Sequence, residues 1–212
     1  EFLGVGHLEP QAGLEIPGSE RAWADVMVRQ LGGRVVAMHP GARWETKRWP
    51  IEHFATVGVH AIREHGASLV LVGSPDERIA TARLKELILR HATDGRVENL
   101  AGGTGLTKLA AVLSAADAVV TNDSGPMHLA AAVETPVIGV FTCTTARRSG
   151  PPRGRHVLIE TSVACGGSYH KRCPQRGTRH LACLQDVSAA EACAGLDRLL
   201  ASAPAIVRRK VA

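Results

Sequence analysis

The stretch AVVTNDSGPMHLAAAV, residues 118–133, decides the fold class. It runs from an apolar strand, expected at 118–121, through small polar residues into an Ala-rich helix expected from Gly125 to about Val133. Pro126 suits the first helical turn, where its missing N–H costs no hydrogen bond. A strand that leads directly into a helix is typical of a parallel sheet, in which ligands bind beyond the carboxyl ends of the strands.

The same order of strand and helix repeats on both sides of this stretch. We expect further strands at 34–38, 68–72, 97–100, 136–141 and 157–159, and helices at 19–31, 51–65, 76–91, 106–115 and 188–200. The strands are continuously apolar rather than alternating, which favours burial on both faces. The sequence therefore predicts an α/β fold with one Rossmann-like parallel sheet and helices on both faces.

Capping residues set the expected ends of this domain, residues 18–200. Ser19 is expected to cap the first helix and Gly32 to end it, while Ser188 and Glu191 have the spacing of a capping box before the last helix. Residues 1–17 and 201–212 are expected to be tails or linkers. Residues 143–187 are rich in Gly, Pro, Arg and Cys and are predicted to be an irregular segment of the same domain.

Composition limits the class of protein. The chain has 212 residues, of which 45% are hydrophobic and 3% aromatic, so one aliphatic core is expected. No run of 18 apolar residues and no signal segment is present, so we expect no transmembrane helix. We expect the protein to be in the cytoplasm, where it could also contact the inner membrane peripherally.

Positive charge is concentrated in the carboxyl-terminal third. The formal net charge is +5, and Glu160 is the single acidic residue between positions 143 and 180. The cationic residues there are Arg147, Arg148, Arg153, Arg155, Lys171, Arg172, Arg176 and Arg179. Aromatic residues do not alternate with these charges, so nucleic acid is not the expected partner, although the charge alone permits it. A phosphorylated small molecule or an anionic glycolipid fits the charge equally well.

The cysteines favour thiols over a metal centre. Their number is five, and an odd count without a secretion signal favours reduced thiols. Cys165, Cys173 and Cys183 lie near two histidines in the sequence and could be zinc ligands. No two of them have the Cys-x-x-Cys spacing of a zinc site, so we favour a segment that binds no metal. An Asp-x-Asp pair is also absent, so a metal-chelated diphosphate and a cofactor are not expected.

The loop HPGARWETKRWP, residues 39–50, follows the first strand of the sheet. Gly41 lets the backbone turn and approach a ligand. Lys47 and Arg48 can donate to phosphate oxygens, and a hydrogen bond with a charged partner contributes about 1.5–3 kcal/mol. The alternative is a solvated loop whose tryptophans merely pack on the domain.

The turn at residues 121–128 has the features of an anion site. The amides of Ser124 and Gly125 would point at an anion at the helix N-terminus, which the helix dipole favours by about 0.3–1 kcal/mol. Asp123 would repel a phosphate and therefore more plausibly accepts from a sugar hydroxyl, while His128 can reach the same anion from the first turn. The alternatives are simple helix capping and a packed histidine.

Two further loops follow strands at the same edge. Asp76 and Glu77 come after the strand at 68–72, where a carboxylate can accept from ribose hydroxyls, or where it is simply a favourable acid at a helix start. The residues do not decide between the two carboxylates. The loop at 99–106 can line a nucleobase through its backbone, although its Gly103-Thr104-Gly105 is a weak signal.

These segments together resemble the heptosyltransferase family of glycosyltransferases, which are inverting two-domain enzymes of the GT-B architecture. The matching stretches are HPGARWETKRWP (39–50), LVLVGSPDE (69–77), NLAGGTGLTKLAAVLSAADAVVTNDSGPMHLAAA (99–132) and TPVIGVF (135–141). The segment CGGSYHKRCPQRGTRHLACL (165–184) is similar to a Cys-containing segment of the heptosyltransferase II branch, although it reads Cys-Gly-Gly where that branch tends to have Cys-x-Pro-Cys.

The resemblance implies a function and a set of roles. The donor would be an ADP-heptose and the acceptor a phosphorylated lipid A core of lipopolysaccharide. Lys47 and Asp123 would be the catalytic residues of this half. The donor-binding residues would be Thr46, Lys47, Asp76, Glu77, Thr104, Leu106, Asp123, Ser124, Gly125, Pro126 and His128.

The family's amino-terminal Rossmann domain has no counterpart in this sequence. That domain carries the Asp thought to act as the general base and most of the acceptor contacts. We therefore expect this chain to be the donor-binding half, inactive alone, with the missing domain as its partner. Two other interpretations stay open: a nucleotide-sugar epimerase of the same architecture, and a non-enzymatic module that binds nucleotide sugars or anions.

Overall fold

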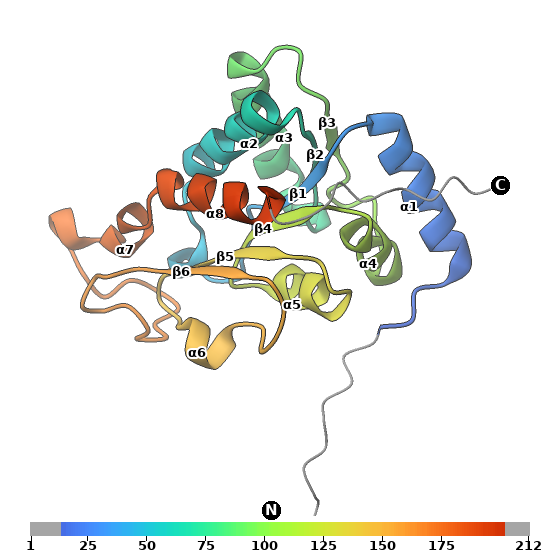
Figure 1. Cartoon of the computed structure of the whole chain (residues 1–212). Helices are drawn as coiled ribbons and strands as arrows, with labels where there is room; N and C mark the ends of the chain where they lie inside the picture. Colours follow the sequence, from blue (N-terminus) through green and yellow to red (C-terminus); the bar gives the residue numbers. More distant parts are fainter. Residues whose placement is uncertain (1–13, 202–212) are drawn as a thin grey trace, which may run out of the picture.

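Within residues 14–201, the part of the chain that the structure describes, six parallel strands form one sheet (Figure 1). The structure is a computed structural model. The strand order is β3-β2-β1-β4-β5-β6. The strands are β1 (Val35–His39), β2 (Ser68–Leu71), β3 (Val97–Asn99), β4 (Ala118–Asn122), β5 (Val137–Phe141) and β6 (Val157–Glu160).

Helices cover both faces of this sheet (Figure 1). One face packs against α1 (Gly18–Leu31), α4 (Leu106–Ser114) and α5 (Gly125–Ala132), and the other against α2 (Ile51–His65), α3 (Arg78–His91) and α8 (Ala189–Ala201). The remaining elements are α6 (Ala146–Ser149), α7 (Ala182–Asp186) and the 3₁₀ turns η1 (Glu45–Lys47), η2 (Pro75–Glu77) and η3 (Gly177–Arg179). The predicted Rossmann-like α/β fold is confirmed.

The central strand β1 shows how the two cores arise. All five of its residues are buried. Val35 and Ala37 belong to the core under α1, α4 and α5, whereas Val36 and Met38 belong to the core under α2 and α8. Because side chains alternate along a strand, His39 lies on the same face as Val35 and Ala37, toward α5.

The strand order reverses between β1 and β4. β1 pairs with β2 on one side and with β4 on the other, and His39 is in register with Thr121. In doubly wound sheets, loops leave the carboxyl ends of two such strands in opposite directions, and the crevice between them is where ligands bind. The fold therefore brings the 39–50 loop and the turn at 121–128 to one place.

Several predicted boundaries are confirmed and two are wrong. The helix at 51–65 ends at Gly66, which is left-handed with φ 58°, and Ser188 and Glu191 form the expected reciprocal capping box. Ser19 does not cap the first helix, because the carbonyl of Pro17 accepts the first helical bonds and places Ser19 inside the first turn. Within residues 143–187 the strand predicted at 157–159 is present as β6, which pairs with β5, but the rest is not wholly irregular because it holds α6 and α7.

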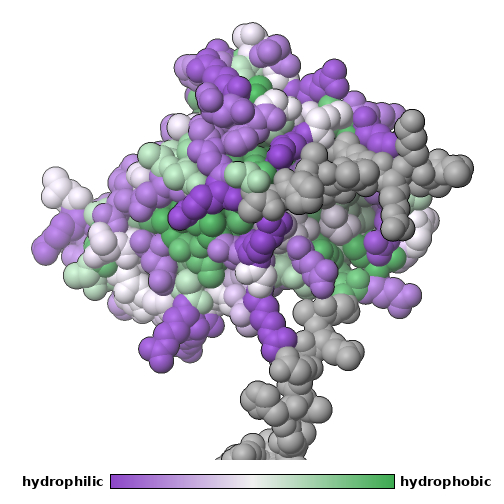
Figure 2. Space-filling model, in the orientation of Figure 1, coloured by the Kyte–Doolittle hydropathy of each residue, from purple (hydrophilic) through white to green (hydrophobic). Residues whose placement is uncertain are grey.

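The predicted tails fall mostly on residues 1–13 and 202–212, which lie outside the described residues. On the face drawn in Figure 2, hydrophobic residues gather near the middle, where Figure 1 draws β6 and α8, with hydrophilic residues around them. No helix within residues 14–201 has the length and apolar character needed to cross a membrane.

Candidate functional site

A cavity of about 770 Å³ lies at the carboxyl ends of β1, β2 and β4. Four loops and helix starts enclose it: the 39–50 loop, the turn before α3, the start of α4 and the start of α5. The residues that line it are His39, Pro40, Gly41, Ala42, Arg43, Arg48, Gly73, Ser74, Asp76, Glu77, Ala80, Thr104, Gly105, Leu106, Leu109, Ser124, Gly125 and Pro126.

Asn122, the last residue of β4, holds the 39–50 loop in place. Its side chain is fully buried and donates to the carbonyls of Pro40 and Gly41 at 2.8 and 3.2 Å. Its Oδ1 accepts from the N–H of Trp49 at 3.2 Å. One side chain therefore satisfies backbone groups at both ends of the loop, which fixes the path of the residues between them.

Lys47 and Asp123 form an ion pair between this loop and the turn after β4. Lys47 Nζ lies 2.7 Å from Asp123 Oδ2, and the two side chains are 17% and 4% exposed. The ammonium also lies 4.6 Å from the centre of the Trp44 ring. The two segments predicted to hold one diphosphate are thus adjacent, and the nearly buried carboxylate has a cation as its partner.

The start of α5 has the open geometry expected of an anion site. Ser124 is extended, with φ −154° and ψ 172°, and its hydroxyl makes no capping bond to the helix. The hydroxyl instead donates to the carbonyl of Asn122 at 3.1 Å. A Cβ on Gly125 would meet nothing within 4 Å, so its backbone is accessible from the cavity. Ser124 occupies the N-cap position of α5, but capping by its side chain, the simpler alternative, is wrong.

His39 and Glu77 join β1 to the start of α3. The His39 imidazole lies between Ser124 and Glu77, with Nδ1 3.1 Å from Ser124 Oγ and Nε2 3.3 Å from Glu77 Oε2. The Ser74 N–H donates to the same Glu77 oxygen at 2.7 Å. A Cβ on Gly41 would lie 1.6 Å from Glu77 Oε1, so only glycine permits this approach. The Glu77 carboxylate is thereby fixed at the cavity wall.

These contacts lower the pKa of Glu77 to about 2. The hydrogen bond from His39 is the largest cause, burial opposes it, and the bond from the Ser74 N–H adds to it. Because the pKa is lower in the folded than in the unfolded chain, the stabilisation is complete above about pH 4.5 and is lost as the pH falls toward about 2.

We therefore expect Glu77→Gln to lower the free energy of unfolding at pH 6 more than at pH 3. At pH 6 the free energies of unfolding of the two proteins should differ by at most about 3 kcal/mol, since a pKa shift of one unit corresponds to about 1.4 kcal/mol. Urea unfolding of both proteins at several pH values between 6 and 3 measures this. A difference that stays constant over the range would show that the carboxylate charge does not stabilise the fold.

The opposite end of the cavity is apolar. Leu106, at the start of α4, is 70% exposed, and Ala80 and Leu109 line the cavity beside it. Thr104 and Gly105 also line this end. An exposed leucine beside these residues suits a flat heterocycle, which needs one apolar face and a few polar contacts.

The predicted site residues divide into two groups. Asp76, Glu77, Thr104, Leu106, Ser124, Gly125 and Pro126 line the cavity. Lys47 and Asp123 form the ion pair next to it. Thr46 instead is buried and donates to the carbonyl of His170 at 2.7 Å, and His128 is exposed and does not line the cavity. The ligand-binding roles of Thr46 and His128 stay predictions.

Sequence reasoning missed three residues of the site. In the sequence, His39 and Asn122 look like ordinary residues at strand ends, and nothing distinguishes Arg43 from the other residues of its loop. The alternation of β1 was the available signal for His39, since it places that side chain on the α5 face at the strand end.

The cysteines and one histidine group are the candidate metal ligands. All five cysteines are free. Burial, followed by the neighbouring thiols, raises the pKa of Cys183 to about 11 and keeps it a neutral thiol. Among the described residues, His60, His65 and Asp197 have ligand atoms within 4.8 Å of one another. They join α2 to α8 near the amino ends of the strands, away from the cavity, through bonds of 2.7 and 2.6 Å to one carboxylate oxygen.

Comparison with known proteins gives a consistent result. The model of a family described as glycosyltransferase family 9 (heptosyltransferase) matches residues 1–178. Lipooligosaccharide heptosyltransferase 2 of Campylobacter jejuni is 25% identical over 163 residues, covering 76% of this chain and 49% of that protein. The lipopolysaccharide core heptosyltransferase OpsX of Haemophilus influenzae is 31% identical over 151 residues, covering 71% of this chain and 42% of that protein.

A solved structure agrees with these relatives. The structure of E. coli ADP-heptose lps heptosyltransferase II superposes with a TM-score of 0.72 at 25% identity, covering 89% of this chain and 53% of that one. The chain spans about half the length of the relatives that it matches.

Proposed function

The chain belongs to glycosyltransferase family 9, and from this membership we propose that it binds the ADP-heptose donor of a heptosyltransferase that extends the lipopolysaccharide core. The observation that carries the proposal is the cavity at the switch point, which is apolar at the α4 end and polar at the start of α5. A nucleoside diphosphate sugar has the same succession of an apolar base and an anionic diphosphate.

Each end of the cavity has a proposed partner. The adenine would lie against Leu106 and the backbone of Thr104, and the ribose hydroxyls would donate to Glu77. Glu77 is preferred to Asp76 because Ser74 and His39 hold its carboxylate in one orientation, so little freedom is lost on binding. The diphosphate would accept from the amides of Ser124 and Gly125 at the N-terminus of α5.

Lys47 and Asp123 would act together at the leaving group. In the proposed reaction an acceptor hydroxyl attacks the anomeric carbon of heptose while ADP departs. Lys47 and the start of α5 would stabilise the charge that grows on the diphosphate, a contribution that is usually large. Asp123, which already binds Lys47 at 2.7 Å, would hold the ammonium at that position or accept from a sugar hydroxyl.

The remaining parts of the reaction lie outside this chain in our proposal. A general base would come from an amino-terminal domain, and transfer would need both halves. The acceptor would be a phosphorylated lipid A core. The same proposal includes a cytoplasmic location with peripheral contact at the inner membrane.

Calorimetric titration of the chain with ADP and with UDP tests the proposal. We expect ADP to bind and UDP to bind more weakly, and Glu77→Gln to reduce ADP affinity by about tenfold, since a hydrogen bond with a charged partner is worth about 1.5–3 kcal/mol. Asp76→Asn, a neutralisation one residue away, is the matched control and should change affinity less.

Other outcomes of this titration would support the competing functions. Preference for UDP would favour the epimerase interpretation. Binding of neither nucleotide would contradict a donor half of either kind and would leave an anion-binding module as the better explanation.

A further inference from the structure

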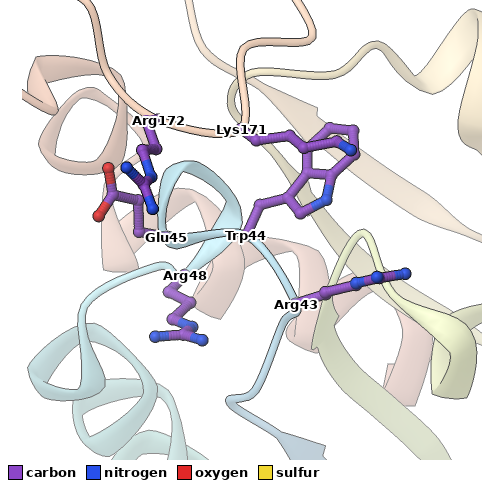
Figure 3. Close-up of a pocket in the computed structure, with 6 residues that line it drawn as sticks. All are labelled: Arg43, Trp44, Glu45, Arg48, Lys171 and Arg172. Carbon is purple, nitrogen blue, oxygen red and sulfur yellow. The ribbon is translucent and has the colours of Figure 1, made fainter.

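A second, smaller pocket of about 370 Å³ lies beside the donor cavity and is strongly basic (Figure 3). It forms where the 39–50 loop meets the cysteine segment, residues 165–184. Arg43, Trp44, Glu45, Arg48, Lys171 and Arg172 line it. Four cationic side chains and one carboxylate therefore surround a space large enough for a small anion and the sugar that carries it.

Two hydrogen bonds fix Lys171 and Arg172 over the loop, although both lie outside regular secondary structure. Thr46 Oγ1 donates to the carbonyl of His170 at 2.7 Å, immediately before the pair. The N–H of Cys173 donates to Glu45 Oε1 at 3.3 Å, immediately after it. The backbone on both sides of the two cations is thus tied to the loop, which places these two exposed residues beside Arg43 and Arg48, which are exposed as well.

The cations have no acidic partner that would explain their gathering. Among the ion pairs of residues 14–201, none involves Arg43, Arg48, Lys171 or Arg172. Glu45 is the one carboxylate in the pocket and already accepts from the backbone of Cys173. Like charges held together in a concave site raise the local concentration of an anion, and a dianion would gain most.

The pocket and the donor cavity share a wall. Arg43 and Arg48 line both spaces. Trp44 of the pocket also lies near the ion pair next to the donor cavity, since its ring centre is 4.6 Å from Lys47 Nζ and 5.6 Å from Lys171 Nζ. A ligand in the basic pocket would therefore lie directly beside a donor in the larger cavity.

We propose that this pocket binds a phosphate monoester carried by the sugar acceptor. The assignment rests on the proposed donor function, because a glycosyltransferase must hold its acceptor next to its donor. A phosphate monoester carries a charge of about −1.5 to −2 at neutral pH, which suits several cations better than the single charge of a carboxylate does. The concave shape favours a discrete ligand over a membrane surface.

The test measures binding of glucose 6-phosphate to the ADP-saturated chain by NMR titration. We expect Lys171→Gln/Arg172→Gln to weaken this binding by about tenfold or more, since two charge-assisted contacts are lost. Arg176→Gln/Arg179→Gln is the matched control: it removes the same charge from exposed residues of the same segment that do not line the pocket. We expect the control to bind within about twofold of the parent and ADP affinity to be unchanged in both variants.

Each other result overturns the proposal. Equal weakening in both double variants would mean a general effect of net charge. Binding of glucose 6-phosphate to the ADP-free chain that is lost in the ADP-saturated chain would place the anion in the donor site. Equal binding of glucuronate would remove the preference for phosphate. Binding to phosphatidylglycerol vesicles that depends on Lys171 and Arg172, without binding of the sugar phosphate, would identify a membrane contact.

The outcome also separates this proposal from the one it rests on. If the chain binds no ADP but binds glucose 6-phosphate through Lys171 and Arg172, the donor function fails and the pocket is an anion site without an acceptor role. If ADP binds and the sugar phosphate does not, the donor function stands and the acceptor assignment fails.

Discussion

Asn122→Ala is expected to lower the free energy of unfolding by about 3–5 kcal/mol, because it leaves two buried backbone groups and one partly buried carbonyl of the 39–50 loop without their partner. The loop carries Lys47, so ADP binding should weaken as well. Urea unfolding followed by circular dichroism and calorimetric titration with ADP measure the two effects.

Asn99→Ala is the matched control for this substitution. Asn99 is the last residue of β3, as Asn122 is of β4, but it accepts one backbone bond, from Ala101 at 3.2 Å, and it is only partly buried. We expect a loss of about 1 kcal/mol there. Equal losses at both positions would mean that the loop is held by other contacts.

Lys47→Ala is expected to cost about 3 kcal/mol of stability and at least tenfold in ADP affinity. The stability is lost because the Asp123 carboxylate, 4% exposed, is left without its cation. The affinity is lost because Lys47 would no longer donate to the diphosphate, a contact worth about 1.5–3 kcal/mol.

The double variant Lys47→Ala/Asp123→Asn separates these two effects. Removing the carboxylate charge should recover part of the stability, since no buried charge is then left unpaired. If Lys47 contacts the diphosphate, ADP affinity stays low in the double variant. If affinity returns with stability, Lys47 acts only by holding Asp123, and its proposed role at the leaving group is wrong.

Lys108→Ala controls for the cation–π contact that Lys47 also makes. Lys108 Nζ lies 4.6 Å from the centre of the Trp23 ring, the same distance as Lys47 from Trp44, and Lys108 does not line the cavity. It should cost about 1 kcal/mol or less and leave ADP binding unchanged.

The sequence predicted those parts of the site that depend on neighbouring residues. The turn at Ser124 and Gly125 follows a buried strand and precedes a helix, and that local order was enough to place its amides at the cavity. The 99–106 loop was found in the same way, from its place between a strand and a helix, whereas Thr104 and Leu106 were assigned within it by the family resemblance. In each case, a few consecutive residues fix the geometry.

The basic segment illustrates what composition could not settle. The sequence shows eight cationic residues between positions 143 and 180, but it cannot distinguish a solvated surface from a binding pocket. The structure separates Lys171 and Arg172 from the rest, because Thr46 and Glu45 of a distant loop hold the backbone on either side of them.

The sequence by itself determined the parallel α/β fold, most ends of its helices and the loops that carry the site, because apolar periodicity, Gly66 and the Ser188–Glu191 box act over a few residues. Only the tertiary structure decided which side chains meet: His39 with Glu77, Lys47 with Asp123 and Asn122 with Pro40 are 38, 76 and 82 residues apart. Those contacts follow from the order of strands in the sheet. That order is set by packing of the whole chain, so no short stretch of sequence predicts it.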